Sequence, residues 1–296
     1  MFSQTLNPWP KSCASCPLVA VCDQIQLTEE RLMIRGMISV AQDQGDKPTQ
    51  ADRYLYFPFS STVSSVSGWL MAVMDGHSHR DTGHVVPELC RLHIAQLFSL
   101  GYAEQAEQSL RELVARLVDM TSGERYSGST LTLALVLESH KSVTIATMGD
   151  SIAMVVKNDI GAHLAPIHNV RVNEHECELA EHRGGIVEGN YLWIPQSASD
   201  DVRPYGLQIS RGLGDGCMKD VILREPEVVT YDLPTRSGVL LITDGVCNAA
   251  GDEFRDNVRG ISQMVRGGAI AQEVLDSQYD PVVRRDNATA LLWSTF

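Results

Sequence analysis

Short apolar runs of strand length recur along most of the chain and are separated by polar or amphipathic stretches. They occupy residues 69–74, 131–137, 143–148, 152–156, 239–243 and 288–293. Runs of this length between polar residues predict buried β-strands. The second and third runs are joined by the polar residues Glu138-Ser139-His140-Lys141, which fits a hairpin and therefore predicts antiparallel pairing.

Two of the intervening stretches carry apolar side chains at helical spacing. Residues 104–120 place their apolar side chains on one face with Glu, Gln and Arg opposite, and residues 86–100 behave similarly. Residues 261–278 show a weaker helical pattern that Gly267-Gly268 interrupts. Antiparallel strands combined with paired helices predict an α+β domain in which helices cover sheets.

Composition and charge narrow the class of protein. The chain has 296 residues, is 44% apolar and 21% charged, and carries a formal charge of −13, so its composition is globular. No apolar run is long enough to cross a membrane, and the N-terminus lacks the features of a secretory signal. A protein that binds nucleic acid through its phosphates needs clustered Lys and Arg, which this chain lacks. We expect no membrane and no nucleic-acid partner.

The seven cysteines divide into two groups. Four are scattered singly, which is typical of buried thiols in a reducing compartment and favours a cytoplasmic protein. Cys13, Cys16 and Cys22 lie together, and Cys-x-x-Cys spacing suits zinc or an iron–sulfur centre, although no fourth ligand lies nearby. Reduced thiols are the simpler interpretation. We predict an N-terminal Cys-containing extension over residues 1–31 and one domain over residues 32–296.

Acidic residues recur at the ends of the predicted strands. Asp75 and Asp244 each follow an apolar run and precede a glycine. Asp150 follows the run 143–148 and comes after a glycine, Gly149, and Asp286 lies two residues before the run 288–293. Each aspartate alone is more simply a turn residue. Four such placements in one chain indicate a site, because strand ends in a layered fold converge on one edge.

Clustered carboxylates have a predictable ligand. Two carboxylates about 4 Å apart repel by roughly 4 kcal/mol at a surface-like dielectric. The cluster therefore needs either raised pKa values or bound cations. Oxygen ligands favour hard ions, so the residues alone predict a Mg²⁺ or Mn²⁺ site.

The order of short motifs along the chain resembles the metal-dependent protein phosphatases of the PP2C type, which hydrolyse phosphoserine and phosphothreonine. The matching segments span nearly everything beyond the extension: residues 43–52, Asp75-Gly76-His77-Ser78, Gly128-Ser129-Thr130, Gly149-Asp150-Ser151, Gly184-Gly185, residues 210–215, Thr243-Asp244-Gly245 and Asp286-Asn287. The resemblance implies an α+β fold of two antiparallel β-sheets in a sandwich, flanked by pairs of helices. It also implies phosphoprotein substrates.

The same resemblance implies a binuclear Mg²⁺ or Mn²⁺ site with a third, weaker ion. Asp75 would bridge the two principal ions. The carbonyl of Gly76 and, through water, Asp52 would serve one ion, while Asp244 and Asp286 would serve the other. Asp150 would help to hold the third.

Two further roles follow from the resemblance. His77 would be the general acid that protonates the leaving alkoxide, which is a poor leaving group without a proton. Lys47 stands where the family has a phosphate-binding arginine, and it offers a point charge instead of a bidentate fork. If Lys47 takes the role of that arginine, phosphate binding should be weaker than with an arginine.

Two rival functions are weighed against the phosphatase. A two-metal nuclease would need a basic track for its polymer, and the charge of −13 opposes it. A catalytically weak or dead module that binds phosphoproteins or partners is favoured by Lys47 and by Ala51, which replaces an acidic or Gln residue. The intact aspartates oppose that alternative.

Three residues near these motifs are interpreted as structural. Asn169 is expected to cap a loop, Arg211 to form a structural ion pair, and Asp215 to be the local partner of Arg211 or a turn residue.

Overall fold

Two five-stranded antiparallel sheets form the body of the protein. In the computed structural model, residues 34–296 form one compact unit, and the described residues are 36–61, 66–78, 82–99, 105–158, 161–195, 205–278 and 285–296. The predicted extension, with Cys13, Cys16 and Cys22, lies outside these residues. Of the helices that are described, none has the length and apolar character needed to cross a membrane.

The first sheet has the strand order β1-β16-β15-β8-β9. Its strands are β1 (Met37–Asp43), β8 (Ile152–Lys157), β9 (Gly161–Leu164), β15 (Ser237–Ile242) and β16 (Ala288–Ser294). The second sheet has the order β14-β7-β6-β3-β2. Its strands are β2 (Arg53–Ser61), β3 (Val66–Met74), β6 (Leu131–Leu137), β7 (Ser142–Met148) and β14 (Glu227–Asp232). All six predicted strands are present, and β6 and β7 pair antiparallel as the hairpin predicts.

The two sheets pack face to face. Their inner faces share one apolar core, to which β3, β6 and β7 contribute from one sheet and β8, β15 and β16 from the other. The central strands are buried along their whole length, as in β6 and β15. Because both faces of these strands are covered, their sequences are apolar throughout and do not alternate with polar residues.

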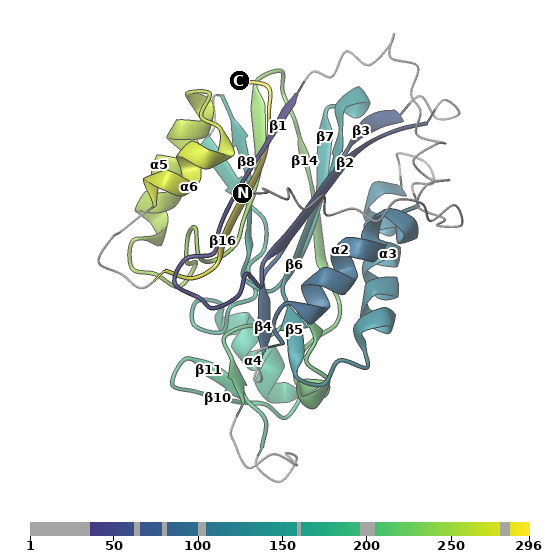
Figure 1. Ribbon diagram of the computed structural model, residues 1–296, viewed down its shortest axis with the longest axis vertical. Helices are drawn as coiled ribbons and strands as arrows, with labels where there is room; N and C mark the ends of the chain where they lie inside the picture. Colours follow the sequence, from purple (N-terminus) through teal and green to yellow (C-terminus); the bar gives the residue numbers. More distant parts are fainter. Residues whose placement is uncertain are drawn as a thin grey trace, which may run out of the picture. The chain divides into compact units, whose positions relative to one another are not determined.

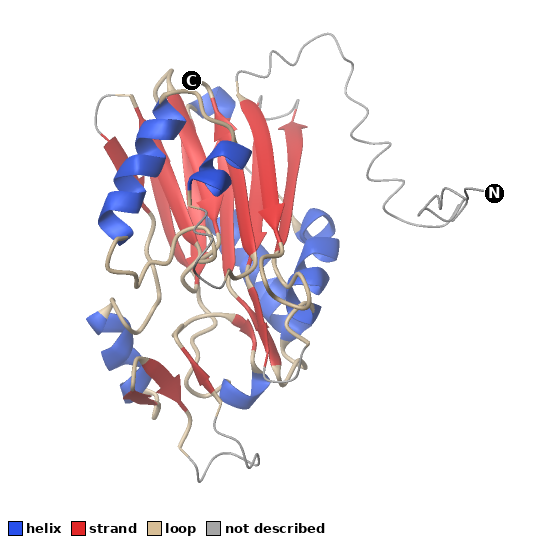
Figure 2. Ribbon diagram, turned by 60° about the vertical axis from the view of Figure 1, so that its left-hand side comes forward, coloured by secondary structure: helices blue, strands red, loops and turns tan. Residues whose placement is uncertain are grey.

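Helices cover the outer faces of both sheets, as Figures 1 and 2 show. α2 (Val85–Leu97) and α3 (Ala106–Thr121) pack on the second sheet, while α5 (Phe254–Arg266) and α6 (Ala271–Ser277) pack on the first. The helical pattern predicted over residues 261–278 is interrupted at Gly267-Gly268 as expected, because α5 ends before Gly267, Gly268 adopts a φ of +88°, and α6 begins at Ala271. A glycine in this conformation ends a helix at little steric cost. The predicted fold class is confirmed.

Smaller elements extend one end of the sandwich. A three-stranded sheet has the order β13-β5-β4 and consists of β4 (Gly76–Ser78), β5 (Ser127–Ser129) and β13 (Leu213–Gly214). A second small sheet consists of β10 (Ile186–Glu188), β11 (Tyr191–Trp193) and β12 (Gly206–Leu207), and it shares an apolar cluster with α4 (Glu174–His182). The short 3-10 turns η2 (Glu138–His140) and η4 (Gly216–Met218) complete the described elements.

We expect the core between the sheets to dominate stability. Leu241→Ala removes a fully buried side chain of that core and should lower the free energy of unfolding by about 2–5 kcal/mol. Ile186→Ala truncates an aliphatic side chain that is 46% exposed and should change it by less than about 0.5 kcal/mol. Urea denaturation of both variants measures the difference. Equal losses would contradict the tight packing of Leu241 between the sheets.

Candidate active site

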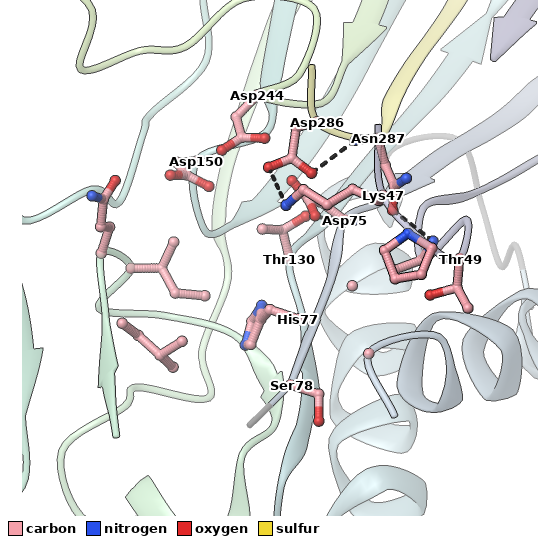
Figure 3. A pocket seen from close by; sticks show the side chains of 17 residues that line it. Lys47, Thr49, Asp75, His77, Ser78, Thr130, Asp150, Asp244, Asp286 and Asn287 are labelled. Atoms are coloured by element: carbon pink, nitrogen blue, oxygen red, sulfur yellow. Dashed lines mark hydrogen bonds and ion pairs between the residues drawn. The ribbon is translucent and has the colours of Figure 1, made fainter. Parts of the chain in front are cut away.

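The four aspartates at strand ends meet at one pocket. Asp75 follows β3, Asp150 lies between β7 and β8, Asp244 follows β15, and Asp286 precedes β16. All four line a pocket of about 400 Å³, together with Gly76, His77 and Lys47. In Figure 3 the carboxylates gather on one side of the pocket and His77 lies below them. Four residues scattered over more than 200 positions of sequence therefore share one site.

The backbone of Asp75 is fixed by the Gly128-Ser129-Thr130 motif. The Asp75 N–H donates to Thr130 Oγ1 at 3.0 Å, and the Thr130 N–H donates to the Asp75 carbonyl at 2.9 Å. Ser129 Oγ donates to the same carbonyl at 3.1 Å. Gly76 follows in a tight space, because a Cβ there would lie 2.1 Å from the Gly83 carbonyl oxygen. The end of β3 is thereby held rigidly at the pocket.

Asp150 is held by a neighbouring amide. Asn169 Nδ2 donates to Asp150 Oδ2 at 2.7 Å, and Asn169 Oδ1 accepts from the Arg171 N–H at 2.9 Å. The second bond confirms that Asn169 caps a loop. The first gives Asn169 an additional contact to the site, which the sequence analysis missed.

Asp52 lies beneath the pocket wall and is completely buried. Its Oδ2 accepts from the hydroxyls of Thr243 and Thr289 at 2.8 and 2.9 Å. Its Oδ1 is buried and has no hydrogen-bond partner. Burial raises the pKa of Asp52 to about 6, the largest influence, while the threonine hydroxyls oppose this rise. One oxygen of Asp52 is therefore left without compensation.

Burial raises the pKa values of three pocket carboxylates, and neighbouring charges add to the rise for two of them. Burial raises the pKa of Asp75 well above its usual range, and the charge of Asp244 raises it further. Burial, followed by the charge of Asp150, raises the pKa of Asp244 to about 7. Burial also raises the pKa of Asp150, and the Asn169 hydrogen bond opposes that rise. The cluster is therefore short of positive charge at neutral pH.

Lys47 provides a cation at the pocket rim. Its Nζ lies 2.7 Å from Asp286 Oδ2, and the two side chains are 39% and 49% exposed. An exposed pair of this kind contributes little to stability. Asp286 is exposed, whereas Asp75, Asp150 and Asp244 are half-buried or buried, and Lys47 lies beside the site.

His77 has a buried acidic partner that the sequence analysis did not assign to it. His77 Nε2 lies 2.7 Å from Asp215 Oδ2, and Tyr205 Oη donates to Asp215 Oδ1 at 2.9 Å. Burial lowers the pKa of His77, but the Asp215 carboxylate outweighs this and leaves the pKa raised. The prediction that Asp215 is a local partner of Arg211 is wrong, because its carboxylate points to His77 across 138 residues of sequence.

Arg211 neutralises a separate acidic cluster. His168, Glu176 and Glu227 bring ligand atoms within 4.8 Å of one another, a spacing that could hold a metal. Arg211, however, donates hydrogen bonds to both oxygens of the buried Glu176 and lies 3.4 Å from Glu227. The predicted structural ion pair of Arg211 is confirmed. Because the guanidinium supplies the positive charge, this cluster requires no ion.

Comparison with known structures identifies the class of fold. A serine-threonine phosphatase 2C from Toxoplasma gondii superposes with a TM-score of 0.66 at 21% identity, covering 87% of this chain and 94% of that one. A C. elegans sex determining protein superposes with a TM-score of 0.67 at 21% identity, covering 88% and 65%. The chain therefore has the fold of these proteins, two sheets flanked by helices.

Sequence comparison identifies the family. The family model of protein phosphatase 2C matches residues 39–275, so the chain belongs to the protein phosphatase 2C family. Among relatives, probable protein phosphatase 2C 62 of Oryza sativa subsp. japonica is 26% identical over 63% of this chain and 65% of its own length. Protein phosphatase 1L of Bos taurus is 24% identical over 73% and 61%. The chain spans less than two thirds of the length of these two relatives.

The pKa values predict how stability depends on pH when no metal is supplied. Asp52 and Asp244 have folded pKa values of about 6 and about 7, against about 4 in an unfolded chain. Since the folded state then binds more protons, the free energy of unfolding in chelator should fall as pH rises from about 4 to about 7. Chemical denaturation across this range measures the slope.

A single substitution should reduce that pH dependence. Asp75→Asn removes one of the repelling charges and should raise the melting temperature in chelator near about pH 7.5. Asp220→Asn makes the same chemical change at an exposed position and should leave the melting temperature unchanged. A fall in melting temperature for Asp75→Asn would show that its carboxylate is compensated within the protein.

Proposed function

We propose that the protein hydrolyses phosphoserine and phosphothreonine on proteins, with divalent cations bound by the pocket carboxylates. The observation that carries this proposal is the convergence of Asp75, Asp150, Asp244 and Asp286 on one pocket beside His77. Membership of the protein phosphatase 2C family supports the same chemistry. Relatives of that name supply the substrate class, phosphorylated proteins.

The chemistry of the donor set fits hard cations. Every candidate ligand is an oxygen, which favours Mg²⁺ or Mn²⁺ over softer metals. The unpartnered Oδ1 of Asp52 and the raised pKa values of Asp75 and Asp244 both indicate missing positive charge.

Each candidate ligand has a proposed place. Asp75 would bridge two ions, Gly76 and Asp52 would serve one of them, Asp244 and Asp286 would serve the other, and Asp150 would help to hold a third. When bound, such ions activate a water for attack on phosphorus and neutralise the phosphoryl oxygens. The protein holds the ligands in place through the Thr130, Asn169 and Thr243 hydrogen bonds.

His77 and Lys47 would handle the substrate. His77 lines the pocket and keeps a raised pKa, so it can donate a proton to the departing seryl or threonyl oxygen. Lys47 lies at the rim and would attract the phosphate as a point charge. Neither step needs a covalent intermediate, and no Cys or Ser is assigned to catalysis.

The test is hydrolysis of p-nitrophenyl phosphate with Mn²⁺ or Mg²⁺. We expect activity that a chelator abolishes, and Asp75→Asn and Asp244→Asn should reduce hydrolysis to the level of the chelated protein. Asp220→Asn provides the matched control and should retain full activity, because its side chain is exposed and outside the pocket.

Calorimetric titration with Mn²⁺ separates the phosphatase from the alternative binding module. An active enzyme should bind Mn²⁺ and hydrolyse the substrate, and Asp75→Asn should lose both properties. Mn²⁺ binding without hydrolysis would favour the module, for which the absence of an acid at Ala51 is the supporting feature. Full activity in both aspartate variants would refute the site.

Lys47 gives a separate prediction about phosphate binding. Lys47→Arg should lower the Michaelis constant, since a guanidinium can bind two phosphate oxygens at once, and Lys47→Met should raise it. Mn²⁺ affinity must be measured alongside, because Lys47 also pairs with Asp286. An unchanged or higher Michaelis constant in Lys47→Arg would show that Lys47 does not contact the phosphate.

A further inference from the structure

A buried carboxylate behind His77 has no role in the chemistry described above. Asp215 is completely buried and, unlike His77, does not line the pocket. Both of its oxygens are engaged, Oδ2 by His77 Nε2 at 2.7 Å and Oδ1 by Tyr205 Oη at 2.9 Å. Because an ionised carboxylate only accepts hydrogen bonds, Nε2 of His77 must carry its hydrogen toward Asp215. The other ring nitrogen, Nδ1, is then the one left for chemistry at the pocket.

The small sheet β13-β5-β4 brings these two residues together. His77 on β4 is paired with Gly128 on β5, and Gly128 is paired on its other side with Gly214 on β13. Asp215 directly follows β13 and must therefore reach across β5 to meet His77. A Cβ on Gly128 would lie 2.0 Å from Asp215 Oδ2. The absent side chain of Gly128 leaves the space through which the carboxylate passes.

The backbone of Asp215 is fixed in an unusual conformation. Its φ of 46° and ψ of 45° lie in the left-handed region, which Asp and Asn tolerate better than most residues. The Asp215 N–H donates to the Ser127 carbonyl at 2.9 Å, and Arg224 donates to the Asp215 carbonyl at 3.1 Å. Several contacts thus hold a strained residue in one position, which is typical of residues that support a functional site.

We propose that Asp215 is a positioning residue for His77, fixing the ring and its tautomer so that the leaving oxygen receives its proton from Nδ1. The inference rests on the proposed phosphatase function and deepens it. In the step, the Nδ1–H bond breaks and the proton passes to the alkoxide oxygen, leaving a neutral ring with hydrogen on Nε2. Asp215 takes no part in the proton transfer, and the Tyr205 hydrogen bond and the space left by Gly128 keep its carboxylate beside the ring.

A carboxylate is required at position 215 for a specific reason. In Asp215→Asn the side-chain amide oxygen can still accept the hydrogen bond from Tyr205. The amide NH₂ group then takes the place of the other carboxylate oxygen and faces His77 Nε2. Nε2 must then accept a hydrogen bond from the amide, so the ring is neutral and carries its one hydrogen on Nδ1. Donating that hydrogen to the leaving oxygen would leave an imidazolate anion, which makes the ring a poor acid. The substitution therefore preserves size and backbone preference but reverses the tautomer.

The experiment compares two leaving groups in the full chain with Mn²⁺. Asp215→Asn should lower kcat on a phosphoserine peptide by about 10²-fold or more, the range typical for loss of general acid catalysis. On p-nitrophenyl phosphate the loss should be at least about tenfold smaller, because an aryl oxide leaves without much help from an acid. Tyr205→Phe should also lose more kcat on the phosphoserine peptide than on p-nitrophenyl phosphate, with a smaller loss overall. Gly128→Ala should lose kcat on the two substrates in the same pattern as Asp215→Asn.

A double-mutant cycle with His77→Gln distinguishes positioning from a merely structural role. If Asp215 acts through His77, then Asp215→Asn should cause little further loss in a His77→Gln background. Asp220→Asn is the matched control and should leave both activities unchanged. Melting temperature and Mn²⁺ affinity of Asp215→Asn should match the wild type.

Two results would overturn the inference. One is an equal loss on both substrates, and the other is a fully additive loss in the cycle. Should Asp215→Asn fail to fold, the leaving-group preference of Tyr205→Phe decides the question by itself. If the wild-type protein hydrolyses neither substrate, the proposed function has failed, which is distinguishable from failure of the positioning role.

Discussion

Repulsion among buried carboxylates is the constraint on which this end of the molecule depends. Asp75, Asp150 and Asp244 would all be ionised in water at neutral pH, yet burial raises the pKa of each, and repulsion from neighbouring carboxylates raises the pKa values of Asp75 and Asp244 further. A fold that gathers them must hold the strand ends in place against that repulsion. The sandwich does so because β3, β7 and β15 are anchored along their whole length in the core between the sheets. Each carboxylate projects from the end of a rigid strand.

The local hydrogen bonds differ from one aspartate to the next. Thr130 and Ser129 bind the backbone of Asp75, whose carboxylate has other carboxylates as neighbours, whereas Asn169 binds one oxygen of Asp150. Asp52 is satisfied at one oxygen and left unpartnered at the other. Proteins rarely leave a buried polar atom without a partner, since the desolvation is not recovered. The unpartnered oxygen of Asp52 is understandable if a cation near the pocket compensates it, as proposed above.

The sequence predicts the central strands and the pocket aspartates because both depend on local pattern. Runs such as 131–137 are apolar throughout, since both faces of their sheet are covered. The edge strands β1 and β2 were not predicted, because their side chains are only partly buried and their sequences therefore lack a continuous apolar run. The partner of His77 escaped for a different reason. Nothing in the local sequence relates positions 77 and 215, which meet only after β13, β5 and β4 have paired.

That pairing separates two kinds of negative charge within one site. The pocket carboxylates are the proposed cation ligands, while Asp215 already has a hydrogen-bond donor at each oxygen and is completely buried. Asp215 is therefore poorly suited to compete for an ion, although it belongs to the same acidic end of the molecule. If the pocket carboxylates bind ions as proposed, the carboxylate beside His77 must be kept apart from them, because an ion bound to Asp215 would displace the imidazole. The glycine at position 128 achieves this separation by admitting Asp215 from behind the ring, away from the pocket.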